Sequence, residues 1–248
     1  MRARWRTIAI VGTVLAAASA TTLGLVSTSS AGRSTRTRPF EDARLKIEYN
    51  ATDGDAGLQI FADTEDPWQE ITVTNPGGRS VAHFEADDVI ENFGLTELFS
   101  ESSEPSFAEF PFDDFKQLFP EGKYTFEGVT IDGARLRSTF ALTHDVPDGP
   151  RITSPTDGAT LDSGGLVVTW DPVTTPKGVD VVAYEVIVVN DKGAPSGGER
   201  TLDVTLPATA SRFPVPAEFL QRGTYKTEVL AIDDGGNQTL NEVAFRIQ

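Results

Sequence analysis

The chain of 248 residues carries 37 acidic and 21 basic residues, a formal net charge of −16, and no cysteine. An acidic surface repels phosphate backbones and anionic lipids, because both kinds of binding depend on Lys and Arg, so nucleic acid is not an expected partner. The lack of cysteine excludes disulfides, thiol catalysis and thiolate metal sites. Stability must therefore come from hydrophobic cores, and the length suffices for two domains of about 100 residues each.

The amino terminus has the pattern of an export signal. Arg2, Arg4 and Arg6 precede an uncharged stretch, residues 7–32, whose most apolar part is 8–18. We predict a signal peptide over residues 1–20, with 31 as an alternative end, followed by a flexible leader over 21–39. An uncleaved anchor is the alternative, since residues 7–26 approach the roughly 20 residues needed to span a bilayer.

The predicted location is secreted, either extracellular or in the cell envelope. No membrane contact is expected after the signal is cleaved. A cysteine-free exported chain is more typical of bacteria than of animals, so we expect a bacterial protein and discount the two glycosylation sequons at Asn50 and Asn237.

The carboxy-terminal hundred residues consist of short β-branched runs separated by Gly, Pro and Asp clusters. This pattern is typical of an antiparallel β-sandwich. The predicted strands are residues 166–170, 181–189, 200–206, 211–215, 225–232 and 242–247.

Residues 149–248 resemble the fibronectin type III family. The resemblance is carried, in chain order, by Pro150, Ser154-Pro155, Trp170, Tyr184, Leu220, Tyr225 and Ala231. It implies a sandwich in which Trp170 and the tyrosines fill the core, with a tyrosine hydroxyl bonded to backbone at a corner.

A partial internal repeat extends this plan to the amino-terminal half. Residues 122–132 align with 223–233, with Gly, Tyr, Glu and the closing Ile-Asp in register. We predict an all-β protein of two tandem antiparallel sandwiches: an Ig-like domain over 40–147 and a fibronectin type III-like domain over 148–248. The predicted strands of the first are residues 45–49, 58–62, 70–74, 81–86, 123–131 and 135–143.

Residues 85–121 depart from the repeat as an acidic insert rich in phenylalanine, with Lys116 as its one base. Apolar residues spaced from 112 to 119 predict a short helix, and residues 89–98 predict another, broken at Gly94. These helices either cover the open end of the sandwich or present a docking patch, for which Phe107, Phe110 and Phe112 are the candidate residues.

No motif predicts catalysis, a cofactor or a metal site. His83 and His144 lack the spacing of zinc ligands, and no nucleophile elbow, P-loop or dinucleotide fingerprint is present. The acidic segments 53–57 and 233–237 are interpreted as hairpin turns, although carboxylates in the latter can also bind Ca²⁺.

The leading hypothesis is a secreted, non-catalytic binding or cell-surface interaction protein whose partner is an unknown protein or polysaccharide. The fibronectin-like resemblance implies a carbohydrate or cell-envelope ligand, but a fold does not fix a function. The alternatives are an exported hydrolase that uses carboxylates of the acidic insert, and a structural spacer.

Overall fold

The computed structural model describes residues 37–248 apart from 193–199, and its compact unit is Thr35–Gln248. The predicted signal peptide and all but the end of the predicted leader lie outside the described residues. The strands are β1 (Asp42–Asn50), β2 (Asp55–Thr74), β3 (Ser80–Glu85), β4 (Leu95–Glu101), β5 (Gly122–Thr130), β6 (Arg135–Leu142), β7 (Ile152–Ser154), β8 (Ala159–Leu161), β9 (Leu166–Trp170), β10 (Val181–Lys192), β11 (Arg200–Pro207), β12 (Arg212–Val215), β13 (Gly223–Asp233) and β14 (Gln238–Ile247). The helices are the 3₁₀ turn η1 (Asp88–Ile90) and α1 (Phe112–Leu118).

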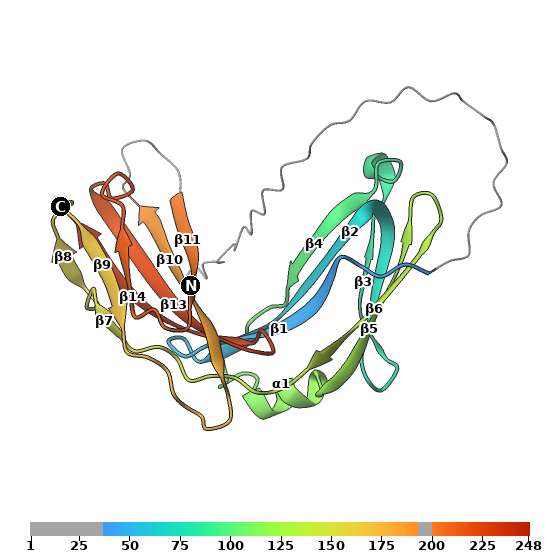
Figure 1. Cartoon of the computed structure of the whole chain (residues 1–248), viewed down its shortest axis with the longest axis horizontal. Helices are drawn as coiled ribbons and strands as arrows, with labels where there is room; N and C mark the ends of the chain where they lie inside the picture. Colours follow the sequence, from blue (N-terminus) through green and yellow to red (C-terminus); the bar gives the residue numbers. More distant parts are fainter. Residues whose placement is uncertain (1–36, 193–199) are drawn as a thin grey trace. The chain divides into compact units, whose positions relative to one another are not determined.

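The predicted fold class is confirmed, since the described chain forms antiparallel β-sandwiches with two main hydrophobic cores. In the second sandwich, β12-β9-β7 form one sheet and β11-β10-β13-β14 the other, and both are visible in Figure 1. Alternation along β9 and β10 turns Trp170 and Tyr184 inward, where their rings lie 5.3 Å apart. Every strand predicted for this sandwich is present, and the prediction missed only the short β7 and β8.

The first sandwich is organised around the bent strand β2. Its first part pairs with β1 and β4, and its second part pairs with β3 and β5. The sequence prediction of two separate strands, 58–62 and 70–74, was wrong, because the backbone continues through the polar residues between them. The register between β2 and β4 shifts between Asp63 and Trp68 of β2, and this bulge lies where β2 passes from its pairing with β1 to its pairing with β5.

The acidic insert is only partly helical. The helix predicted from residue 112 is α1, which buries Phe115 in the core. The second predicted helix, over 89–98, was wrong: only η1 is helical, and residues from Leu95 onward form β4. Gly94 ends the turn with φ of 66°, and strand pairing with β2 outweighs the local helical spacing.

A parallel pairing of β1 with β14 joins strands of the two sandwiches, with Glu48 opposite Gln238. Asn237 strengthens this junction: its Oδ1 accepts from the Ile47 backbone N–H at 2.9 Å, and its Nδ2 donates to the Asp145 carbonyl at 2.7 Å. Asn237 is fully buried, so its sequon offers no accessible glycan acceptor. The limits predicted for the two domains, 40–147 and 148–248, stay predictions, since both lie in one compact unit.

Candidate functional site

The three phenylalanines predicted as a docking patch are half-buried, and two of them contact Tyr49. Phe107 and Phe112 lie 5.0 and 5.2 Å from the Tyr49 ring, and Phe110 packs against the first core. Their side chains therefore contribute to folding of the first sandwich. Whether the surface that they leave exposed also docks a partner stays a prediction.

The two most exposed large apolar side chains of the insert, Val89 and Phe93, lie elsewhere, on and beside the η1 turn. Val89 is 86% exposed and Phe93 is 74% exposed, with Ile90 and Ile131 also open to solvent. We call Val89, Ile90, Phe93 and Ile131 the apolar tip. The η1 turn and the β5–β6 hairpin lie at the same end of the first sandwich (Figure 1), as the packing of Gly94 on Ile131 requires.

The backbone holds the apolar tip in a fixed conformation. The Ile90 carbonyl accepts from the N–H groups of Phe93 and Gly94, at 2.9 and 2.8 Å. Asp88 adopts φ of 53°, which is uncommon for a residue other than glycine and stores strain. The exposed acids Asp87, Asp88 and Glu91 lie next to the apolar side chains in sequence. Exposed apolar side chains on a turn with a fixed backbone are available to contact another molecule.

The two histidines have structural contacts. Nδ1 of His83 lies 2.9 Å from the Thr72 hydroxyl on the neighbouring strand, and Nε2 of His144 lies 2.8 Å from the Phe119 carbonyl oxygen. In the described part of the chain, neither histidine belongs to a group of side chains spaced to hold a metal ion.

The two acidic turns are hairpin connections, as predicted. Residues 51–54 join β1 to β2, and the Asn50 side chain accepts from the N–H groups of Thr52 and Asp53, each at 2.9 Å. Asp233, the last residue of β13, is buried, and burial raises the pKa of its carboxyl to about 6. Both segments connect neighbouring antiparallel strands.

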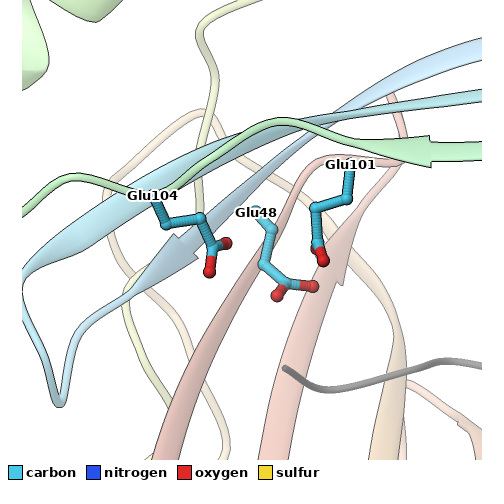
Figure 2. A group of neighbouring side chains, drawn as sticks. All are labelled: Glu48, Glu101 and Glu104. Carbon is cyan, nitrogen blue, oxygen red and sulfur yellow. The ribbon is translucent and has the colours of Figure 1, made fainter. Parts of the chain in front are cut away.

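The structure brings together three carboxylates that the sequence analysis did not connect. Figure 2 shows the side chains of Glu48, Glu101 and Glu104 projecting into the same space, from β1, from the end of β4 and from the segment after it. One oxygen of each lies within 4.8 Å of the others. We call Glu48, Glu101 and Glu104 the carboxylate cluster.

Two amide side chains bind the carboxylate cluster. Gln59 Nε2 donates to Glu48 Oε2 and to Glu101 Oε1, both at 2.9 Å, and Gln238 Nε2 also donates to Glu48 Oε2. Burial raises the pKa of Glu48 to about 7, although both hydrogen bonds favour its charged form. Three converging carboxylates of this kind can share a proton or hold a cation.

Two further ionisable side chains, Glu185 and Lys46, lie on strands of the same continuous sheet as Glu48. Burial and the nearby Asp203 raise the pKa of Glu185 on β10 to about 8. Burial lowers the pKa of Lys46, whose ammonium lies 5.2 Å from the centre of the Phe61 ring. The pairing of β1 with β14 places these groups of different strands within electrostatic range of Glu48.

The sequence offered one usable signal for the carboxylate cluster. A glycine in a strand leaves space for side chains of neighbouring segments. Gly57 lies opposite Glu48 in the β1–β2 hairpin, and this pair indicates space beside a charged residue. Glu101 and Glu104 could not be placed by the same reasoning, since their segment was predicted outside any strand.

No family model matches the chain, and no curated protein matches it. Among solved structures, the chain is similar to the FN1-FN3 domains of chicken CNTN1, at 14% sequence identity and a TM-score of 0.30. That match covers 85% of this chain and 66% of the chicken chain. The FN3/Ig-like assignment of the fold therefore depends on the strand pairing described above. None of the helices in residues 37–192 and 200–248 has the length and apolar character needed to cross a bilayer.

Proposed function

We propose that this chain is an exported, non-catalytic interaction protein that binds a protein partner through the apolar tip. The observation that carries the proposal is the exposure of Val89 and Phe93, at 86% and 74%, on a turn held by its own hydrogen bonds. Side chains of this size gain free energy by leaving water, and a fixed backbone lowers the entropy lost on binding.

The chemistry of the tip favours a partner with an apolar hollow surrounded by basic residues. Asp87, Asp88 and Glu91 are exposed acids of the same turn, and the whole chain carries a net charge of −16. Complementary charge speeds association and selects the partner, whereas the apolar contact supplies most of the affinity. Aliphatic side chains with one phenylalanine suit a protein surface better than a polysaccharide.

Export is part of the proposal because of the amino-terminal pattern of three arginines and an uncharged apolar stretch. The alternative of a hydrolase that uses carboxylates of the acidic insert has weaker support, since Glu48, which Glu101 and Glu104 of the insert approach, is buried and its Oε2 accepts from two amide groups. Phe107, Phe110 and Phe112 remain a second candidate surface. Phe110 and Phe112 pack on the first core and Phe107 packs on Phe112, so their replacement by alanine cannot separate docking from folding.

The test is affinity capture from culture supernatant and envelope fractions. The bait is the exported chain, compared with a Val89→Ser/Phe93→Ser variant. A Val182→Ser variant is the matched control, because Val182 is an exposed valine on β10 of the other sandwich.

The expected result is a protein that is retained by the parent chain and the control and is lost with the tip variant. Circular dichroism verifies that all three chains are folded. Equal retention by the tip variant would contradict the proposal, as would capture of polysaccharide alone. Retention of nothing by the parent chain would favour the spacer function.

A further inference from the structure

The carboxylate cluster, which the proposed function does not use, is built from three separate segments. The oxygens of Glu48, Glu101 and Glu104 lie within 4.8 Å of one another. Ca²⁺ binds oxygen ligands at about 2.3–2.6 Å, so two ligands on opposite sides of the ion lie about 4.8 Å apart. The spacing therefore suits one shared ion.

The surrounding chain leaves room for this convergence. A methyl group at Gly57 would lie only 2.8 Å from Glu104 Oε1, so the lack of a side chain at this position lets Glu104 fold over β2. Gly57 is also the cross-strand neighbour of Glu48. The glycine thus allows Glu104 and Glu48 to lie close together.

An independent observation points to a ligand. The Gln238 side chain is only 4% exposed, and its Oε1 has no hydrogen-bond partner. The Nε2 of the same amide donates to Glu48, so a half-turn of the amide group exchanges its two atoms and brings Oε1 to the side of Glu48. A buried carbonyl oxygen without a partner is costly, and coordination of a cation removes that cost. Amide carbonyl oxygens are common Ca²⁺ ligands.

We propose that Glu48, Glu101 and Glu104 bind one Ca²⁺ ion, with Gln238 Oε1 as a further ligand after its amide turns toward the ion. The ligand set consists only of oxygen atoms, which favours a hard cation. Ca²⁺ tolerates irregular sets of six to eight oxygens, whereas Mg²⁺ demands a near-ideal octahedron. Since Gln238 belongs to β14 and Glu48 to β1, the ion stabilises the pairing that joins these strands.

The experiment is isothermal titration calorimetry of CaCl₂ into the full chain, with EDTA-treated protein and constant ionic strength. We expect one site with a dissociation constant between about 10⁻⁵ and 10⁻³ M, and weaker binding of MgCl₂. Glu101→Gln and Glu104→Gln should each weaken Ca²⁺ binding by at least about tenfold, because each removes a charged ligand.

Two further variants separate this site from general attraction to an acidic surface. Glu97→Gln removes an exposed carboxylate from the same strand, β4, and should leave Ca²⁺ binding unchanged. Gly57→Ala removes no charge but displaces Glu104, and it should weaken binding. Circular dichroism verifies folding, and added Ca²⁺ should raise the melting temperature of the parent chain more than that of Glu101→Gln.

Absence of saturable heat up to about 10 mM Ca²⁺ would overturn the proposal, since this concentration exceeds the range of extracellular Ca²⁺ sites. Equal losses in Glu97→Gln and Glu101→Gln would also overturn it, because they would indicate diffuse attraction. Tighter binding of Mg²⁺ than of Ca²⁺ would contradict the assignment of the ion. None of these outcomes depends on the apolar tip, so the proposed function can fail or hold independently.

Discussion

Tyr124 and Tyr225 occupy equivalent corners of the two sandwiches. Each is fully buried, and each hydroxyl donates to the carbonyl oxygen four residues earlier, at 3.0 Å to Pro120 and 2.8 Å to Gln221. Both tyrosines also lie on strands that pair with the last strand of their sandwich, β6 or β14. The internal repeat found in the sequence therefore reflects one structural feature used twice.

Replacement of these tyrosines by phenylalanine should destabilise the sandwich concerned. Tyr124→Phe loses one hydrogen bond and should lower the free energy of unfolding by about 1 kcal/mol. Tyr225→Phe should cost more, about 2 kcal/mol, because the Tyr225 hydroxyl also accepts from the Gln221 N–H at 2.6 Å. Urea unfolding followed by tryptophan fluorescence measures both. A smaller loss for Tyr225→Phe than for Tyr124→Phe would contradict this account of the corner.

Gly94→Ala should destabilise the base of the apolar tip. Its Cβ would lie 2.7 Å from both Ile131 Cγ2 and Pro67 Cβ, on a backbone with φ of 66°. We expect a loss of roughly 2 kcal/mol in the free energy of unfolding, from strain and overpacking together.

Two control glycines separate the causes of that loss. Gly78 has φ of 80° but open space around it, so Gly78→Ala should show only the smaller backbone penalty. Gly164 has open space and no positive φ, and Gly164→Ala should be nearly neutral. Equal effects of all three substitutions in urea unfolding would refute the role of packing at Gly94.

The stability of the chain should fall as pH rises from about 4.5 to about 8. Burial and Asp203 raise the folded-state pKa of Glu185 from 4.5 to about 8, so the folded protein holds a proton that the unfolded chain has released. Above the unfolded pKa, each rise in pH therefore favours the unfolded chain. Melting temperatures between pH 4.5 and 9, measured in EDTA, test this.

Glu185→Gln should flatten the decline of melting temperature with pH, because the amide has no proton to lose. Glu218→Gln, at an exposed position in the same sandwich, should retain the slope of the parent chain. If Glu185→Gln kept the full slope, other carboxylates would be responsible for it.

Asn237→Ala should weaken the junction between β1 and β14. The substitution leaves the buried Ile47 N–H without an acceptor and removes a donor to the carbonyls of Thr143 and Asp145. A loss of about 2–3 kcal/mol is expected in the free energy of unfolding. The exposed Asn92 provides the control, and Asn92→Ala should change stability by less than about 0.5 kcal/mol. A neutral Asn237→Ala in urea unfolding would mean that water replaces these contacts.

The strands of the second sandwich could be predicted because their burial alternates with the period of an extended chain. Leu166, Val168 and Trp170 point inward with Val167 and Thr169 between them. Such alternation is a local property, readable from five residues. The bend of β2 is not local, since partners on both sides keep its polar middle extended.

The candidate docking residues also show which properties are local in the sequence and which depend on the fold. The sequence located an acidic insert rich in phenylalanine, but it could not tell which rings pack inward. Phe107 and Phe112 are half-buried because Tyr49 arrives from β1, more than fifty positions earlier in the chain, whereas Phe93 stays exposed beside η1.

The sequence by itself determined the class of the protein: an acidic, cysteine-free, all-β chain with a repeated tyrosine corner. Those properties depend on composition and on short-range periodicity. Only the tertiary structure decided which residues come together in the carboxylate cluster and in the apolar tip. Glu48 meets Glu101, and Ile131 meets Gly94, through strand pairing between segments distant in sequence. Such contacts are fixed by the fold as a whole, and no local pattern of residues encodes them.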